Sequence, residues 1–358
     1  SGALPQDKLN AWMNGYDPGI PYLKTVTNGI RTGLAMAATA PQTIIPYTNM
    51  RGASVREEEF PIFKDEWLMG DYAPQKWHEY ESGFGYCALA CRSRQDFILW
   101  CLNRMLESGA LDGIYYDVTY PKASRNTITG NAYYDDNGKL RTGCDLFESR
   151  ELFKRSAVLT WQKRGYNLNV AHMSFTLIAP LHTWAGAILD WETRYGMEDF
   201  QDRFSREYIR TLSIGRQTGS VPLVLGSLGI QGKAELRPHV ERTLTGVALT
   251  HEVKDWAIAC KKSGVYYQTL KKLYDFGYGQ PDCAVYNYWN RDFPVTVTGI
   301  DYSALALVRN GRMLLVLCEY GNGGNAELTL NREIGLMPNG TMSDAENFPI
   351  IPQNDRYS

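Results

Sequence analysis

The stretch Leu111-Asp-Gly-Ile-Tyr-Tyr-Asp-Val-Thr-Tyr-Pro121 has the composition of a buried strand that ends in an acid. Residues 114–116 are strand formers, Gly113 permits close approach of a neighbouring segment, and Pro121 prevents continuation. Residues 96–109, directly before it, have the apolar spacing of a helix and stop at a glycine. A helix followed by a buried strand with an acid at its carboxyl end is typical of an α/β barrel.

Asp117 is therefore the first candidate catalytic residue. Barrel enzymes carry their chemistry at the carboxyl ends of the strands, where Asp117 lies, whereas Asp112 lies at the opposite end. The alternative interpretation is that Asp117 caps the turn that follows the strand. One strand taken alone does not separate the two.

Residues 186–192 (GAILDWE) repeat this pattern of an apolar strand that runs into acids. Asp190 and Glu192 are two positions apart, so they would share one face if the strand continued through both. Glu192 is nearer the carboxyl end and is the predicted second catalytic acid, with Asp190 as its alternative. Trp191 alternates with the two acids and is expected in the core.

Strands and helices alternate along the chain from residue 42 to about residue 275, which predicts a mainly parallel sheet. The expected strands are 42–47, 111–117, 167–172, 186–192 and 221–225. The expected helices are 96–109, 149–164, 198–214, 235–250 and 270–276. We therefore expect an α/β fold in which residues 1–283 form a (β/α)8 TIM-type barrel.

The pattern changes after residue 283, where short β runs are separated by glycine-containing turns. Asn310-Gly311 lies between two apolar runs and predicts a hairpin. We expect residues 284–358 to form a C-terminal antiparallel β-sandwich. A second hairpin signal, Asp135-Asp-Asn-Gly138, lies in the polar insertion 122–143 that directly follows Asp117.

Charge, hydropathy and motif spacing give no support to several classes of partner. A net charge of −2 gives no reason to expect a nucleic-acid partner. No apolar run approaches the roughly 20 residues of a membrane span. His172 together with the candidate acids could ligate a metal, but no HxH or HExxH spacing supports one. We expect neither a metal nor another cofactor.

Two carboxylates on different strands of one barrel face are the minimal equipment for glycoside hydrolysis. We predict a carbohydrate substrate and a retaining mechanism, with the carboxyl groups of Asp117 and Glu192 about 5–5.5 Å apart. Side chains near the strand ends would bind the sugar by hydrogen bonds and ring stacking. These predicted substrate-binding residues are Tyr47, Arg51, Tyr116, Tyr120, Arg125, His172, His182 and Trp184. For each histidine, a structural role in the packed interior is the alternative.

Five segments together carry a family resemblance: PYTNMRGAS, DFILW with LDGIYYDVTYP, NVAHMS, AILDWETRYG and VPLVLG. They resemble the α/β-barrel glycoside hydrolases of the α-galactosidase and endo-α-N-acetylgalactosaminidase type, closest to the bacterial branch similar to glycoside hydrolase family 123. The resemblance covers residues 42–350, and the run from Ala304 to Leu336 is similar to the family's C-terminal sandwich. It implies a nucleophile at Asp117, an acid/base at Glu192 or Asp190, and a secreted or periplasmic location.

The sequence departs from this family at two points. Substrate-assisted members have an adjacent Asp-Glu pair after the fourth strand, whereas Val118 follows Asp117 here, which argues against N-acetyl assistance. Only about 40 residues are left for the first two barrel strands. Three explanations stay open: an incomplete chain, a modified barrel, or strands supplied by a second copy or another partner chain.

A rival hypothesis from another class is a non-catalytic carbohydrate-binding or assembly protein that keeps the barrel. The short N-terminal region and the odd number of cysteines, seven, support it. A cavity faced by both acids would favour the enzyme. Acids engaged in ion pairs would favour the rival.

Overall fold

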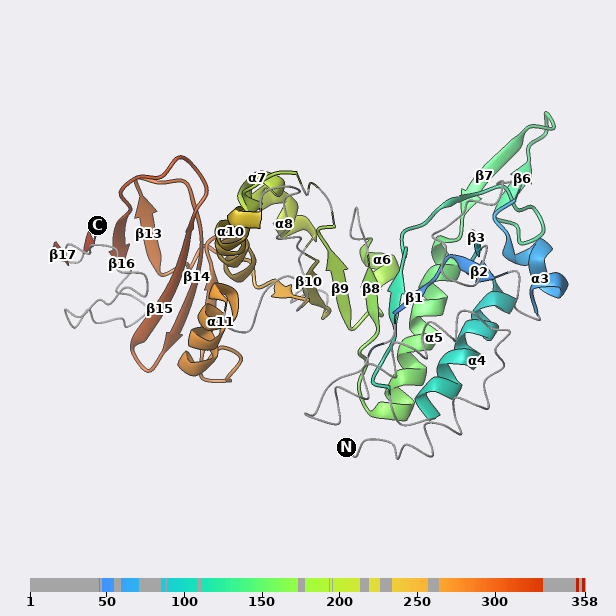
Figure 1. Cartoon of the computed structure of the whole chain (residues 1–358), viewed down its shortest axis with the longest axis horizontal. Coiled ribbons are helices and arrows are strands. Elements are labelled where there is room, and N and C mark those ends of the chain that lie inside the picture. Colours follow the sequence, from blue (N-terminus) through green and yellow to red (C-terminus); the bar gives the residue numbers. More distant parts are fainter. Residues whose placement is uncertain are drawn as a thin grey trace. The chain divides into compact units, whose positions relative to one another are not determined.

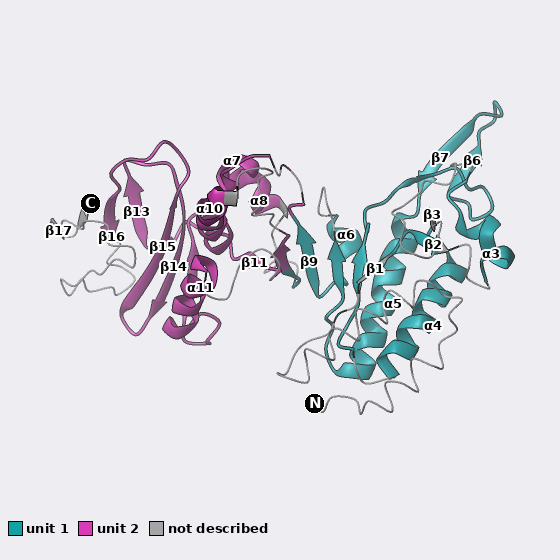
Figure 2. Cartoon of the chain, viewed as in Figure 1, with its two compact units in different colours: residues 1–190, 215–221 teal, residues 191–214, 222–358 magenta. Residues whose placement is uncertain are grey.

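The computed structural model is shown in Figure 1. It describes residues 45, 47–54, 59–70, 85–87, 89–107, 111–172, 178–192, 194, 196–212, 219–225, 234–256, 264–330, 352–353 and 356–357. The chain divides into two compact units, which are coloured in Figure 2. Residues 1–190 and 215–221 form the first unit, and residues 191–214 and 222–358 form the second.

The first unit is built on four short parallel strands. β1 (Tyr47–Asn49), β4 (Tyr115–Asp117), β8 (Val170–His172) and β9 (Ala187–Asp190) lie side by side in that order. Asn49 pairs with Asp117, and His172 pairs with Leu189. All four carboxyl ends therefore meet at one edge of the sheet, as the sequence predicts for β4, β8 and β9.

Helices cover one face of this sheet (Figure 1). α4 (Arg92–Glu107) and α5 (Leu146–Arg164) pack on each other and, with the short α6 (Ala179–His182), on the sheet. One strand residue from each of three strands enters their shared apolar core. That core includes Tyr116, Ala171 and Ile188 of the sheet and Phe97, Leu102, Leu152, Phe153 and Leu181 of the helices.

The predicted role of Gly113 is confirmed. A Cβ atom at this position would overlap the backbone carbonyl of Leu168, just before β8. Gly186, before β9, meets the carbonyl of Asn167 in the same way. The two glycines therefore allow the segments that lead into neighbouring strands to approach each other closely.

A small antiparallel sheet follows Asp117. β5 (Ala123–Ser124), β7 (Leu140–Cys144) and β6 (Ala132–Tyr134) lie in that order, and the predicted turn at Asp135–Gly138 joins β6 to β7. Nearby, α3 (Phe60–Trp67) contacts the strand β2 (Gly52–Ser54). β2 pairs antiparallel with β3 (Gly85–Cys87).

The second unit begins with helical segments and two parallel strands. β10 (Val221–Val224) pairs with β11 (Lys254–Asp255). The first residue of β10, Val221, is the last residue of the first unit. The other elements of this region are α7 (Phe200–Arg203), α8 (Arg206–Leu212), the 3-10 helix η1 (Ala234–Leu236), α10 (Arg237–Thr250) and α11 (Val265–Phe276). α10 is the central helix, because it contacts α7, α11 and the strands that follow.

The C-terminal part is antiparallel β structure, as predicted. One sheet has the order β12-β14-β15 and the other β13-β16-β18-β17. The bounds are β12 (Ala284–Asn287), β13 (Val295–Thr298), β14 (Tyr302–Arg309), β15 (Arg312–Glu319), β16 (Glu327–Leu330), β17 (Pro352–Gln353) and β18 (Arg356–Tyr357). Asn310 and Gly311, both at positive φ, form the predicted hairpin turn between β14 and β15.

Several local expectations need correction. The single helix expected over 198–214 is interrupted at Phe204 and Ser205, which separate α7 from α8. Trp161 belongs to the apolar pattern of the helix expected over 149–164, but it is 61% exposed on α5. The described part of the first strand begins at Tyr47, and most of 42–46 lies outside the described residues.

The larger expectations are confirmed only in their coarser form. The structure has an α/β part with parallel strands and a separate antiparallel part. A closed barrel of eight strands is not seen among the described residues. The boundary between the two units falls at about residue 190, inside the predicted barrel, and the boundary expected at residue 283 stays a prediction.

Candidate functional site

The carboxyl ends of β4 and β8 bring two polar side chains into contact. Asp117 is the last residue of β4, and His172 is the last residue of β8. Nδ1 of His172 lies 2.8 Å from Oδ1 of Asp117. His172 is buried, whereas 18% of the Asp117 side chain is exposed. The sequence predicted both residues at this edge, and the fold brings them together.

The backbone around Asp117 further fixes its carboxylate. The N–H of Val118 donates to Oδ1 of Asp117 at 2.8 Å, and Val118 has a φ of 56°. The hydroxyl of Thr119 donates to the carbonyl of His172 at 2.7 Å, which ties the turn after β4 to the end of β8. Asp117 therefore does cap its own turn, and this is compatible with a functional role because the carboxylate stays accessible.

Asp190 does not share the face of Asp117. Side chains alternate along a strand, and the register pairs His172 with Leu189. Leu189 therefore lies on the Asp117 side, and Asp190 falls on the side of Ile188, which packs against the helices. Asp190 is buried there.

Glu192 lies beyond the strand and belongs to the second unit. β9 ends at Asp190, and Trp191 has a φ of 76°, so strand alternation does not continue to Glu192. The expectation that Asp190 and Glu192 share a strand face is therefore wrong. Glu192 is partly exposed, and Trp191 is buried, as predicted.

Arg51 was expected to bind substrate, but the structure gives it a buried structural role. Its guanidinium forms an ion pair with Asp145, directly before α5, and both side chains are almost completely buried. It also donates to the carbonyl of Tyr120 at 2.9 Å and to the hydroxyl of Ser149 at 3.3 Å. The arginine links the end of β1 to the start of α5, and its burial contradicts the expectation of substrate contact.

Tyr116 is also corrected. It alternates with Asp117 and points into the helix layer, where its hydroxyl lies 2.7 Å from that of Ser156 on α5. Its ring packs edge-on against Phe153. Burial raises the pKa of the Tyr116 hydroxyl well above its usual value. It is a core residue.

His182 and Trp184 lie on the helix side as well. Nε2 of His182 is 3.2 Å from the Thr119 hydroxyl, and Nδ1 is 2.9 Å from the carbonyl of Ile178. Burial lowers the pKa of His182 to about 4, so the ring is neutral at pH 7. Trp184 precedes β9 and therefore lies at the amino end of that strand, where it packs against the first unit's core. For His182 the structural alternative is the better description, and Trp184 lies at the end of the sheet opposite Asp117.

The remaining predicted residues have separate positions. The side chain of Tyr47 lies outside the described residues, although its backbone pairs with Tyr115 in β1. Tyr120 contributes its carbonyl to Arg51, and Lys122 lies over its ring at 5.5 Å. Arg125 is exposed, and its backbone N–H donates to the carbonyl of Met69.

Two strand-end residues were missed by sequence reasoning. Asn49 ends β1 and pairs with Asp117 in the parallel register. Asp255 ends β11 in the second unit, where its carboxylate accepts a hydrogen bond from Tyr267 at 3.3 Å. A sequence signal for Asp255 existed, because Asp255-Trp256 repeats the Asp190-Trp191 pair.

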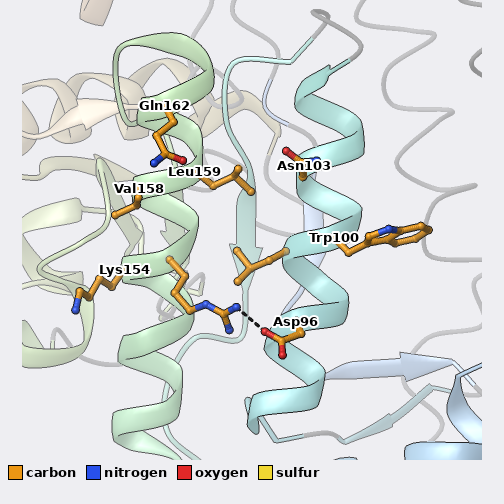
Figure 3. Close-up of a pocket in the computed structure, with 9 residues that line it drawn as sticks. Asp96, Trp100, Asn103, Lys154, Val158, Leu159 and Gln162 are labelled. Atoms are coloured by element: carbon orange, nitrogen blue, oxygen red, sulfur yellow. Dashed lines mark hydrogen bonds and ion pairs between the residues drawn. The ribbon is translucent and has the colours of Figure 1, made fainter.

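A separate cavity of about 460 Å³ lies between α4 and α5, and the residues that line it all come from these two helices (Figure 3). Leu99 and Leu159 are among its apolar lining residues. The indole of Trp100 points outward from α4 (Figure 3). Arg155 and Asp96 form an ion pair of 2.5 Å beside it. These groups hold the two helices together.

Other kinds of site receive no support within the described part of the chain. No group of three or more histidine, cysteine or acidic side chains gathers there as metal ligands would. The described helices also lack a stretch with the length and hydropathy that a membrane crossing requires.

No protein-family model matches the sequence, and a search of the curated proteins finds no relative. Among solved structures, the chain is similar to the noncanonic maltogenic α-amylase AmyB of Thermotoga neapolitana, with 11% identity, a TM-score of 0.49, and 84% of this chain and 70% of that chain covered. It is also similar to the GH36 α-galactosidase AgaA of Geobacillus stearothermophilus, with 11% identity, a TM-score of 0.42, and 89% and 39% covered. A third structure, Ega3 of Aspergillus fumigatus in complex with galactosamine, has 12% identity, a TM-score of 0.37, and 63% and 78% covered. Likenesses this distant decide neither the fold nor the chemistry.

Proposed function

We propose that this protein is a retaining glycoside hydrolase that cleaves glycosidic bonds of an oligo- or polysaccharide. Asp117 is the nucleophile and Glu192 the general acid/base, whereas Asp190 is set aside because it lies buried on the opposite face of the sheet. The parallel strands belong in this proposal to a (β/α)8-type barrel and the antiparallel sheets to a C-terminal sandwich. The resemblance to the family 123-like branch is part of the same proposal.

The single observation that carries this proposal is the placement of Asp117. It combines a position at the carboxyl end of a parallel strand with partial exposure and a carboxylate that His172 and Val118 hold in one orientation. Parallel α/β folds carry their chemistry at this end, and an oriented carboxylate suits attack on a sugar carbon.

The reaction has two steps in this proposal. The Asp117 carboxylate attacks the anomeric carbon while Glu192 transfers its proton to the leaving glycosidic oxygen. The bond from the anomeric carbon to that oxygen breaks, and a glycosyl ester forms on Asp117. Glu192 then takes a proton from water, whose oxygen attacks the anomeric carbon and releases Asp117 as a carboxylate.

The non-catalytic carbohydrate-binding alternative keeps one specific observation in its favour. The carboxylate of Asp117 is in contact with an imidazole, and such a pair can serve stability alone. The two functions differ in turnover, which can be measured directly.

The test is hydrolysis of a panel of 4-nitrophenyl glycosides by the unsubstituted chain and by Asp117→Asn. We expect turnover of at least one glycoside and a loss of about a thousandfold or more in the variant, because no nucleophile remains. Asp112→Asn is the matched control, since Asp112 lies at the other end of the strand and accepts from Tyr166. An undiminished rate in Asp117→Asn removes that residue from the mechanism.

The acid/base role is assigned by comparing Glu192→Ala with Asp190→Asn. Loss of the acid slows glycosides with poor leaving groups far more than 4-nitrophenyl glycosides, which need little protonation. Added azide should restore turnover of the 4-nitrophenyl glycosides in Glu192→Ala by attacking the glycosyl ester. Asp190→Asn should not show this pattern, because Asp190 faces the helices. The same pattern in both variants, or in neither, would remove the acid/base role from Glu192.

A further inference from the structure

The antiparallel sheet that follows Asp117 forms an arm, defined here as residues 123–144. In Figure 1 the β6–β7 hairpin extends away from the rest of the first unit. Two tyrosines on β6 are mostly exposed, Tyr133 by 62% and Tyr134 by 66%. Neither ring is packed into the core, so both are accessible to a ligand.

We propose that this arm is a glycan-binding element, with Tyr133, Asp135 and Arg141 as its sugar-binding site. The inference rests on the proposed function, because the glycan is taken to be the polymeric substrate of the same protein.

The base of the arm is rigidly attached. The side-chain amide of Asn126 donates to the carbonyls of Leu68 at 2.7 Å and Asp65 at 2.9 Å, and its oxygen accepts from the N–H of Ile128 at 2.9 Å. A Cβ at Gly70 would lie 2.8 Å from the Cβ of Arg125, so the two segments are in direct contact. An arm anchored in this way loses little conformational entropy when a ligand binds.

The tip of the arm is equally well ordered. Oδ1 of Asp135 accepts the N–H groups of Asn137 at 3.0 Å and Lys139 at 2.9 Å, and Oδ2 lies 2.8 Å from Nε of Arg141. The hydrogen bond from Lys139 is the main reason that the pKa of Asp135 lies below its usual value. The tip therefore presents a fixed carboxylate beside a fixed guanidinium.

These groups lie on one face of the hairpin. Arg141 is the cross-strand partner of Tyr133, and the Asp135 carboxylate contacts the side chain of Arg141. Directly paired residues share a face of a β-ribbon. The ring of Tyr133 is therefore flanked by the Asp135–Arg141 pair, whereas Tyr134 lies on the other face with Leu140.

The chemistry of this face suits an uncharged sugar. A phenol ring offers a flat apolar surface with a polar tip, which matches the apolar face and hydroxyl rim of a pyranose. The carboxylate and the guanidinium supply an acceptor and several donors for neighbouring hydroxyl groups. Their charges cancel, so the face offers no net attraction to a phosphate or an acidic peptide.

A protein partner fits less well. A stable protein interface needs roughly 800 Å² on each side. β6 has three residues, and its two tyrosines point to opposite faces, so neither face offers a large contiguous apolar surface. A sugar ring needs only the area of one aromatic side chain.

The test is affinity electrophoresis of the whole chain carrying Asp117→Asn, which should not degrade the polymer during the run. The probes are soluble starch, galactomannan, arabinoxylan and pectic galactan. We expect retardation by at least one of them, about tenfold weaker binding after adding Tyr133→Ala, and binding kept in Tyr133→Phe. Arg141→Met should also weaken binding, because hydroxyl donors are lost.

Phe147→Ala is the matched control, since Phe147 is exposed to 76% but lies on α5 outside the arm. It should bind as the parent does, and circular dichroism should show every variant folded. Absence of retardation by all four polymers, or equal retardation of Tyr133→Ala, would overturn the inference. So would a change in sedimentation from dimer to monomer on Tyr133→Ala, because the tyrosine would then serve a protein contact.

The two proposals fail separately in this design. Retardation that depends on Tyr133, with no hydrolysis of any glycoside by the unsubstituted chain, would overturn the proposed hydrolase and support glycan binding. Hydrolysis of a glycoside without retardation by any polymer would overturn the proposed glycan-binding role of the arm and support the hydrolase.

Discussion

The imidazole of His172 and the carboxylate of Asp117 meet across two neighbouring parallel strands, with Nδ1 and Oδ1 2.8 Å apart. The same oxygen accepts the N–H of Val118 at 2.8 Å. Contacts from two directions restrict how the carboxylate can rotate. His172 thus acts in this proposal as a positioning residue for Asp117, which is a more specific role than the substrate contact expected from sequence.

Removing this contact should slow catalysis more than it weakens substrate binding. In His172→Ala we expect kcat to fall about a hundredfold with a smaller change in KM, because a loosened nucleophile reaches the reactive geometry less often. The pH–rate profile should also change, whereas loss of packing alone would leave its shape intact. His172→Gln, which keeps a side-chain donor, should recover part of the rate. His239→Ala, at an exposed site, is the control. Identical profiles for His172→Ala and the parent would contradict the positioning role.

Arg51 should matter for stability. In Arg51→Met the carboxylate of Asp145 stays buried without its cation, and we expect a loss of about 3–5 kcal/mol in the free energy of unfolding. Urea unfolding measures this loss. The double variant Arg51→Met/Asp145→Leu should be more stable than Arg51→Met, since no unpaired charge remains. A single variant as stable as the parent would show that the buried pair contributes nothing.

Protonation of His182 should lower the free energy of unfolding in mild acid. Its pKa is lowered to about 4 in the folded chain, against about 6.5 when unfolded. Between these values the unfolded state binds the extra proton, so stability is fully present above about pH 6.5 and falls as the pH decreases toward 4. The loss attributable to this residue is about 3 kcal/mol.

The measurement is the free energy of unfolding from pH 7 to pH 4.5 for the parent and His182→Gln. The variant should show a shallower decrease, whatever its stability at pH 7. Parallel curves for parent and His182→Gln would assign the acid sensitivity to other groups. His251, whose pKa burial also lowers to about 4, is the next candidate.

Replacing Gly113 by a larger residue should destabilise the folded protein. A methyl group there would collide with the carbonyl of Leu168, so β4 or the segment before β8 must move. We expect Gly113→Ala to cost about 1–3 kcal/mol of unfolding free energy and to reduce activity by shifting Asp117 against His172. Gly196→Ala is the matched control, because a Cβ there meets nothing within 4 Å and should change stability by less than about 0.5 kcal/mol. Equal thermal midpoints for both variants would remove the predicted clash.

The sequence by itself determined the local features of this protein. Apolar periodicity located α4 and α5, and the acid-ended pattern located β4 and β9. Gly113 and the Asn310-Gly311 turn were predictable because close approach and positive φ select for residues without steric conflict. These features depend on interactions within a few residues, which the order of the chain records.

Only the tertiary structure decided which side chains face the candidate site. Arg51 lies at a strand end by sequence, but its partner Asp145 is 94 positions away, so its burial could not be foreseen. Asp190 resembles Asp117 in its local pattern, yet the register of β8 and β9 places it on the helix face. Strand pairing and ion pairing join distant segments, and a change of one residue in register moves a carboxylate from one face of the sheet to the other.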